Sequence, residues 1–185
     1  MALPPLAPHT ATHHSRAMPA PFDLVLPLHG PDATAALAAS IAPLCRAGDV
    51  IALWGGIGAG KSHFARALIA TRLAAAGRAE DIPSPTFTLV QTYDADEIEI
   101  WHSDLYRLTH ADEVLELGLE DAFDSALCLI EWPDRLGSDL PGRALHLRLD
   151  PGSGPDDRIA RLHAMGGGWA DRLAPIRDRA TVAHD

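Results

Sequence analysis

Eight consecutive residues, 55 to 62, have the types and the spacing of a phosphate-binding loop. Glycines let the backbone turn tightly enough to aim several N–H groups at one anion, and the helix that follows adds the partial positive charge of its N-terminus. A lysine after the last glycine can reach the β- and γ-phosphates, and the next hydroxyl can reach Mg²⁺. This is the Walker A pattern, and we predict that all eight residues bind ATP: Gly55, Gly56, Ile57, Gly58, Ala59, Gly60, Lys61 and Ser62.

Lys61 is the only lysine among the 15 basic Lys and Arg residues of the chain. Lysine presents a compact charge on a flexible stem, whereas the planar guanidinium of arginine fits poorly into a tight phosphate cradle. A chain that otherwise uses arginine has a lysine at this one place. This favours a nucleotide-binding loop over a glycine-rich turn without a ligand.

Two carboxylates follow predicted strands and are candidates for the chemistry. Glu131 comes directly after the apolar run Ala126–Ile130, and Asp104 lies just past the segment Glu97–His102. P-loop proteins hold a carboxylate near Mg²⁺, usually at the end of a strand beside the first one. We therefore expect Ser62 and Glu131 to serve the metal, and Asp104 and Glu131 to be the catalytic residues. Which of the two carboxylates acts as the base stays open.

Three further residues read as a switch. Ser84, Pro85 and Thr86 lie between the helix after the glycine loop and the next strand, where many nucleotide hydrolases sense the γ-phosphate. Pro85 would stiffen this segment and Thr86 would supply a hydroxyl. Trp132 follows Glu131 and is expected to neighbour the nucleotide.

The elements that must position these residues alternate between strands and helices. Wholly apolar runs predict buried strands, and runs with every second residue apolar predict strands with one wet face. Strands are expected at Phe22–Leu28, Val50–Trp54, Phe87–Tyr93, Glu97–Trp101, Ala126–Ile130, Arg143–Asp150 and Arg158–Met165. Helices are expected at about Ala33–Arg46 with Asp32 as N-cap, from the glycine loop to Gly77, at His110–Leu117, at Glu120–Phe123 and near Trp169–Leu173.

This order predicts an α/β fold: a single P-loop NTPase domain with a mixed, mainly parallel sheet of about six or seven strands flanked by helices. A length of 185 residues suits one such domain. We expect the ATPase domain to span residues 23–173. Residues 1–22, rich in Pro, Ala and His, read as a disordered N-terminal extension, and residues 174–185 as a flexible C-terminal tail.

The composition of the chain limits which binding partners and which cellular compartment we expect. No apolar run approaches the roughly 20 residues of a membrane span, so we expect no membrane contact and a cytoplasmic protein. The chain has 25 acidic and 15 basic side chains and a net charge of −10, so any RNA in its function is expected to be held by a partner. The two cysteines, Cys45 and Cys128, are expected to be buried small hydrophobes, which suits a reducing compartment.

Taken together, these motifs resemble the bacterial TsaE family of ATPases in tRNA threonylcarbamoyladenosine biosynthesis. The resemblance covers about Leu24 to Leu173, and Asp32-Ala33-Thr34 is similar to the N-terminal element of that family. The order and spacing of the motifs fit throughout. The resemblance rests on the glycine loop, Ser84–Val90, His102–Leu108, the segment from Glu113 to Gly118, and Glu131-Trp132-Pro133.

The resemblance implies a function as well as a fold. It implies an ATPase, weak alone and more active with TsaB and TsaD homologues, that is required for N6-threonylcarbamoyladenosine at position 37 of tRNAs reading codons that begin with A. The protein would drive or reset that machinery and would not perform the transfer; it would meet tRNA only through the complex. By position, Thr34 and Trp132 would neighbour ATP, Ser62 and Glu131 would serve Mg²⁺, and Asp104 would serve catalysis.

Two positions depart from the family pattern, and two alternatives stay open. Gly56 stands where the family commonly has an acidic or amide residue, and Ser62 stands in place of the commoner threonine. The alternatives are a small-molecule P-loop kinase, which would need an acceptor pocket and usually an arginine-bearing lid, and a nucleotide sensor that binds ATP without hydrolysing it.

Overall fold

The computed structural model describes residues 21–108, 113–114 and 116–182. Most of the N-terminal extension and half of the helix predicted at His110–Leu117 lie outside these residues. Phe22, which we placed both at the end of the extension and at the start of the first predicted strand, is buried and begins that strand, as the strand prediction had it. Within the described residues, no helix is long and apolar enough to cross a membrane.

A seven-stranded sheet runs through the described part of the molecule, in the order β1-β7-β6-β2-β5-β4-β3. Its four middle strands, β6, β2, β5 and β4, are parallel, and antiparallel strands flank them on both sides. This confirms the predicted mixed α/β fold. The strands are β1 (Phe22–Leu28), β2 (Val50–Trp54), β3 (Val90–Ala95), β4 (Ile98–Asp104), β5 (Leu127–Glu131), β6 (Leu145–Pro151) and β7 (Arg158–Ala164).

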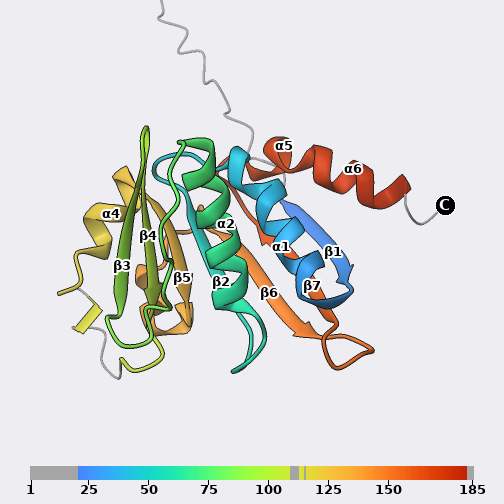
Figure 1. Cartoon of the computed structure of the whole chain (residues 1–185), viewed down its shortest axis with the longest axis horizontal. Coiled ribbons are helices and arrows are strands. Elements are labelled where there is room, and N and C mark those ends of the chain that lie inside the picture. The colour runs from blue at the N-terminus through green and yellow to red at the C-terminus, as the bar shows by residue number, and fades with distance from the viewer. Residues whose placement is uncertain (1–20, 109–112, 115, 183–185) are drawn as a thin grey trace, which may run out of the picture.

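Helices cover the sheet unevenly. The α-helices are α1 (Gly30–Ile41), α2 (Lys61–Ala75), α4 (Leu119–Ser125), α5 (Trp169–Arg172) and α6 (Ala174–Val182), and the 3-10 helices are η1 (Ala42–Leu44) and η2 (Pro133–Asp139). Figure 1 shows α1 and α2 side by side over one face of the sheet. On the other face, α4 and η2 contribute to a second, smaller core around β5 and the start of β2.

Side-chain alternation along β5 and β6 explains this layering. In β5, Leu127 and Leu129 enter the core under α1 and α2, while Cys128 and Ile130 enter the second core, so the strand is apolar throughout. In β6, Leu145, Leu147 and Leu149 also enter the first core, but the residues between them are polar and belong to neither core. The sheet is therefore covered on both faces at β5 and on one face at β6.

The first helix differs from its predicted bounds. Asp32 is not its N-cap: α1 begins at Gly30, His29 is the N-cap, and Asp32 lies in the first turn. Pro31 explains this start, because proline is pre-organised for the first helical turn, where its missing N–H costs nothing. The α-helix ends at Ile41 rather than Arg46 and gives way to the 3-10 turn Ala42–Leu44, because Pro43 has no N–H to donate to the preceding turn of an α-helix.

Two other predicted segments need correction. Residues 87–89 are not part of a strand: the Leu89 N–H donates to the Pro85 carbonyl at 2.7 Å, Leu89 has φ +65°, and β3 begins only at Val90. Residues 174–182, which we placed in a flexible tail, form α6. Ile176 anchors this helix, since its side chain is buried in the main core.

Candidate functional site

The glycine loop lies where its chemistry requires. Buried β2 ends at Trp54, the loop follows, and α2 begins at Lys61 with Gly60 as its N-cap. Gly55, Gly58 and Gly60 have φ of +137°, +75° and +102°, conformations that L side chains rarely adopt. At its far end α2 finishes as predicted: the N–H groups of Gly77 and Arg78 donate to carbonyls of the last turn.

The first two glycines of the loop differ in what they tolerate. A Cβ on Gly55 would lie 2.6 Å from the Leu149 carbonyl oxygen and 2.9 Å from the Ala59 Cβ, whereas a Cβ on Gly56 would meet nothing within 4 Å. We expect Gly55→Ala to lower the free energy of unfolding by about 2–4 kcal/mol, from overpacking and backbone strain. Gly56→Ala is the matched control, with an expected change within about 0.5 kcal/mol. Urea denaturation measures both, and equal losses would contradict this account.

Lys61 folds back over the loop. Its Nζ donates to the carbonyl oxygens of Gly55 and Gly56 at 2.8 and 2.9 Å and lies 4.1 Å from the centroid of the Trp132 ring. Burial lowers the pKa of Lys61 from its ordinary value, and the carboxylates of Glu131, Asp104 and Asp134 oppose that change. The ammonium is therefore held next to the loop in a partly desolvated position, where a phosphate oxygen can replace the carbonyls.

Hydrogen bonds connect the half-buried Ser62 with the buried Glu131 and His102. The Ser62 hydroxyl donates to Glu131 Oε2 and the His102 Nε2–H donates to Glu131 Oε1, both at 2.9 Å. His102 is fully buried and Glu131 is 2% exposed. Since the carboxylate only accepts hydrogen bonds, its two oxygens require the proton of His102 to sit on Nε2. The Glu131 carboxylate is thus fixed in one orientation beside the serine.

Asp104 lies next to Glu131 but has different partners. The two residues are directly paired across the parallel strands β4 and β5. Asp104 Oδ2 accepts from the Thr86 hydroxyl at 3.0 Å, and Oδ1 accepts from the Tyr106 N–H at 3.0 Å. Because Thr86 gives its only hydroxyl proton to Asp104, the 2.8 Å contact between Ser84 and Thr86 must have Ser84 as donor. A chain of hydrogen bonds therefore joins the predicted switch segment to Asp104.

Trp132 is held in an uncommon backbone conformation. Its φ of +58° and ψ of +52° are left-handed helical values, which cost a non-glycine residue about 1–2 kcal/mol. The ring contacts Tyr106, with centroids 4.9 Å apart, as well as the Lys61 ammonium. Such strain persists only where the surroundings impose it, and it is typical of functional sites.

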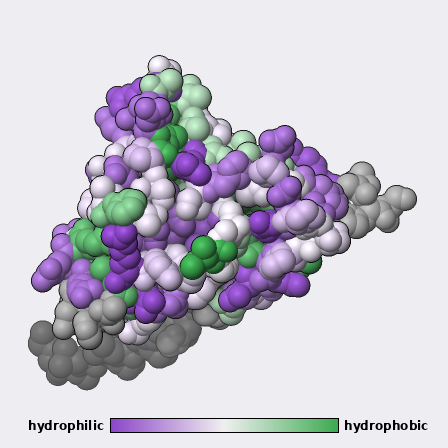
Figure 2. Space-filling view, turned by 60° about the horizontal axis from the view of Figure 1, so that its bottom comes forward, coloured by the Kyte–Doolittle hydropathy of each residue, from purple (hydrophilic) through white to green (hydrophobic). Residues whose placement is uncertain are grey.

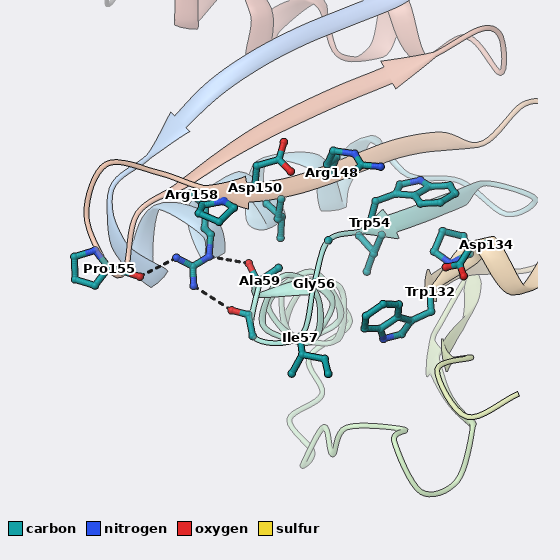
Figure 3. Close-up of a pocket in the computed structure, with 16 residues that line it drawn as sticks. Trp54, Gly56, Ile57, Ala59, Trp132, Asp134, Arg148, Asp150, Pro155 and Arg158 are labelled. Carbon is teal, nitrogen blue, oxygen red and sulfur yellow. Dashed lines mark hydrogen bonds between the residues drawn. The ribbon is translucent and has the colours of Figure 1, made fainter.

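Thr34 and Arg158 reach the loop from the other side. Thr34 is buried in α1 and, with Gly60, His63 and Arg158, lines a hollow of about 100 Å³. The Arg158 guanidinium donates to the carbonyl oxygens of Ala59 and Gly58, each at 3.0 Å, and to residues of the β6–β7 turn (Figure 3). Arg158 thus ties that turn to the glycine loop. Sequence reasoning missed it, because no local pattern marks an arginine that acts 99 residues from its partner.

A cavity of about 590 Å³ opens beside the loop. Loop residues 55–59, Trp54, Trp132, Asp134 and Arg148 help to line it, and Figure 3 shows Trp132 and Trp54 on one side and Arg158 on the other. Ile57, one of these loop residues, is 81% exposed. Figure 2 turns this edge toward the viewer and shows a mostly hydrophilic surface with small hydrophobic patches. The edge suits a charged ligand such as a nucleotide.

The oxygen donors fit Mg²⁺ shared with a nucleotide. Mg²⁺ prefers oxygen ligands and keeps several waters, so it is usually held by one or two protein groups together with phosphates. Ser62 and Glu131 provide such a pair, whose oxygens are 2.9 Å apart. In the part of the chain that the structure describes, no cluster of three His, Cys, Asp or Glu side chains could hold a metal without such help.

Together, the buried strand, the glycine loop, the lysine-headed helix and the serine–carboxylate pair define a P-loop nucleotide-binding protein. Residues 28–159 match the model of the family described as threonylcarbamoyl adenosine biosynthesis protein TsaE. The chain therefore belongs to the TsaE family, which is involved in tRNA threonylcarbamoyladenosine biosynthesis.

Individual relatives agree with this assignment. The tRNA threonylcarbamoyladenosine biosynthesis protein TsaE of Rickettsia conorii is 41% identical over 107 residues, 58% of this chain and 59% of that protein. Its Bacillus subtilis counterpart is 33% identical over 141 residues, 74% of this chain and 82% of that protein. The match thus spans less than two thirds of the Rickettsia relative. The crystal structure of Bacillus subtilis YdiB superposes with a TM-score of 0.68 at 25% identity, over 86% of this chain and 97% of that one.

Proposed function

We propose that this chain binds ATP with Mg²⁺ and hydrolyses it. The observation that carries the proposal is the convergence of Lys61, Ser62, Asp104 and Glu131 at the carboxyl ends of three adjacent parallel strands. In parallel α/β sheets, ligands bind at this edge. The bound Mg²⁺ would supply charge neutralisation for the transferred phosphoryl group.

The hydrogen-bond partners support distinct roles for the two carboxylates. Glu131 is held by His102 and contacts Ser62, so we assign it with Ser62 to the Mg²⁺ shell. Asp104 is joined to the switch segment through Thr86, so we assign it to orienting the attacking water and accepting its proton. Lys61 exchanges its two loop carbonyls for phosphate oxygens, and Thr34 and Trp132 lie on either side of the nucleotide.

The link between the switch and Asp104 has a direct test in Thr86→Val. Valine keeps the branched shape but removes the hydroxyl that donates to Asp104. We expect ATP turnover to fall by about 10- to 100-fold through misorientation of the carboxylate, with ATP binding retained. Thr88→Val is the control, because Thr88 is exposed and only accepts from the Gln91 side chain. Phosphate release and calorimetry measure the two effects, and equal turnover in both variants would exclude the link.

For the biological role, we propose that ATP hydrolysis supports formation of N6-threonylcarbamoyladenosine at position 37 of tRNAs reading codons that begin with A. The chain would act in the cytoplasm with homologues of TsaB and TsaD and would not perform the transfer itself. Family membership supports this role. The net charge of −10 agrees with a protein that leaves the tRNA to its partners.

Two experiments test the proposed ATPase activity and the proposed pathway separately. Phosphate release from ATP in buffer without any acceptor separates a hydrolase from a small-molecule kinase and from a non-hydrolysing sensor, since the latter two would release none. Depletion of the protein in cells, followed by nucleoside analysis of tRNA, tests the pathway. We expect threonylcarbamoyladenosine to fall, and an unchanged level in cells without a second copy would overturn the pathway assignment.

A further inference from the structure

Part of the sheet presents a face that neither hydrophobic core includes. Across β2, β6, β7 and β1, the residues Trp54, Arg148, Arg161 and Val25 stand in register as one row. None of them belongs to a core cluster, and Val25 is 54% exposed. The neighbouring row contains His146 and His163, which face each other with ring centroids 6.3 Å apart. Five of these residues line a hollow of about 310 Å³, called here the Trp54 hollow: Trp54, His146, Arg148, Arg161 and His163.

The Trp54 hollow has a basic and aromatic lining in an acidic protein. Four of its five residues are Arg or His and none is Asp or Glu, although the chain has 25 acidic against 15 basic side chains. Asp150 pairs with Arg161 at 3.2 Å, and Asp23 pairs with His163 at 2.7 Å. Arg148 has no carboxylate among the ion pairs of the described residues; its guanidinium lies 6.0 Å from the Trp54 ring centroid. Of the two arginines, only Arg148 is therefore without an ion pair in the described part of the chain.

Trp54 forms a fixed floor for this hollow. Its indole N–H donates to His146 Nδ1 at 3.1 Å, and the two rings stack with centroids 5.8 Å apart. Burial and the neighbouring His163 lower the pKa of His146, so the neutral ring that accepts this bond is favoured. The floor is thus held in place without any ligand, which reduces the ordering cost of binding.

We propose that the Trp54 hollow and the adjoining Val25 form a docking surface for an acidic segment of a protein partner. The proposal rests on the proposed function, since the TsaB–TsaD pair is the partner in which the segment is sought. Trp and Arg dominate the energetics of protein interfaces when they surround a hollow that excludes water. A carboxylate of the partner would pair with Arg148 and Arg161, and an adjacent apolar group would contact Trp54 and Val25.

A protein occupant fits the charges better than RNA. Binding to a phosphate backbone usually needs several cations, each neutralising one phosphate. The hollow offers two arginines, one of which is already paired, on a chain with a net charge of −10. A short segment with one or two carboxylates matches that number.

The position of the hollow explains how docking would reach the nucleotide. Trp54 directly precedes Gly55, and both Trp54 and Arg148 also line the 590 Å³ cavity beside the loop. Figure 3 shows these two side chains at the edge of that cavity, next to the loop. A partner in the Trp54 hollow would therefore contact the residue that leads into the phosphate loop. This gives partner stimulation of the ATPase a physical route.

Two variants away from the nucleotide test the surface. Arg161→Glu reverses a charge on β7, and Val25→Asp places a charge on β1; neither residue lines the cavity beside the loop. We expect each to weaken binding to the purified TsaB–TsaD pair of the same organism by about 10- to 30-fold, as for interface hot spots. Basal phosphate release should stay unchanged. Arg177→Glu, on exposed α6, makes the same charge change elsewhere and should bind like the wild type.

The outcomes distinguish a failure of the docking surface from a failure of the proposed partnership with TsaB–TsaD. If wild-type protein does not bind the TsaB–TsaD pair, the partnership fails and the docking surface with it. If the wild type binds and Arg161→Glu binds equally well, the partnership stands and the surface is wrong. Binding of a tRNA transcript by the isolated chain, lost in Arg161→Glu, would make RNA the occupant and overturn the protein assignment. Arg161→Gln replaces the charge-reversal variant if the latter unfolds.

Discussion

Replacing Lys61 with alanine is expected to lower ATP turnover by about 10²- to 10³-fold, the cost of removing one pre-positioned donor from a phosphoryl-transfer site. The ammonium lies against the Gly55 and Gly56 carbonyls at 2.8 and 2.9 Å. It can therefore reach a phosphate on the loop by a small movement of its side chain. ATP binding should weaken as well, because in the proposed mechanism the same charge would contact the bound nucleotide. Phosphate release and calorimetry measure the two effects.

The Lys61 variants also separate charge from shape and from folding. Lys61→Arg keeps the positive charge but not its compact form, and we expect it to recover little of the turnover. The stability of Lys61→Ala should change by no more than about 1 kcal/mol, because a desolvated charge is lost while two carbonyls regain water. Wild-type phosphate release from Lys61→Ala would remove the glycine loop from the proposed mechanism.

The parts of the fold that follow from local pattern were predictable. The period-two leucines of β6 and the unbroken apolar run of β5 indicated correctly how each strand is buried, since side chains alternate between the two faces of a sheet. The glycine after α2 correctly marked the end of that helix, because glycine readily adopts the left-handed conformation that ends many helices. Such features depend on residues a few positions apart, which a single sequence contains in full.

The errors in the predicted elements occur where a turn or a proline nearby in the sequence determines the backbone conformation. Phe87 looked like part of a strand because it is apolar, yet it is 81% exposed in a turn that Leu89 closes onto Pro85. The start of α1 was read from Asp32, a good N-cap residue, whereas Pro31 sets the first turn. Hydrophobicity and capping preference are weak signals when backbone constraints nearby compete with them.

In the candidate site, too, the sequence indicated some residues but not the long-range contacts between them. The residue types and strand ends located Ser62, Asp104 and Glu131, and the structure brings all three together. The hydrogen-bond partners that distinguish the two carboxylates were not visible in the sequence. His102 meets Glu131 across 29 residues and Arg158 meets the loop across 99, contacts that only the pairing of strands creates. One feature of the sequence could have indicated His102: it stands two residues before Asp104 and thus lies on the same face of β4.

Replacing Glu131 with glutamine is the second large effect that we expect: turnover should fall by about 10²- to 10³-fold while ATP binding without Mg²⁺ is kept. The variant isolates charge because the side chains have nearly the same shape. The amide oxygen can still accept from His102 Nε2–H, and the amide N–H₂ can donate to the Ser62 hydroxyl oxygen, which reverses that hydrogen bond. Folding should therefore be preserved, and the loss should come from the missing negative charge in the Mg²⁺ shell.

Comparison with Glu131→Ala shows why the amide is the better probe. Alanine leaves the fully buried His102 N–H without an acceptor, which costs about 1–3 kcal/mol of stability and mixes folding with function. Phosphate release across a range of Mg²⁺ concentrations, with ATP binding measured in a chelator, separates the two roles. If excess Mg²⁺ restores turnover in Glu131→Gln, Glu131 acts by holding the ion. If turnover stays low with Mg²⁺ bound, the carboxylate itself takes part in the reaction, and the division of roles with Asp104 is wrong.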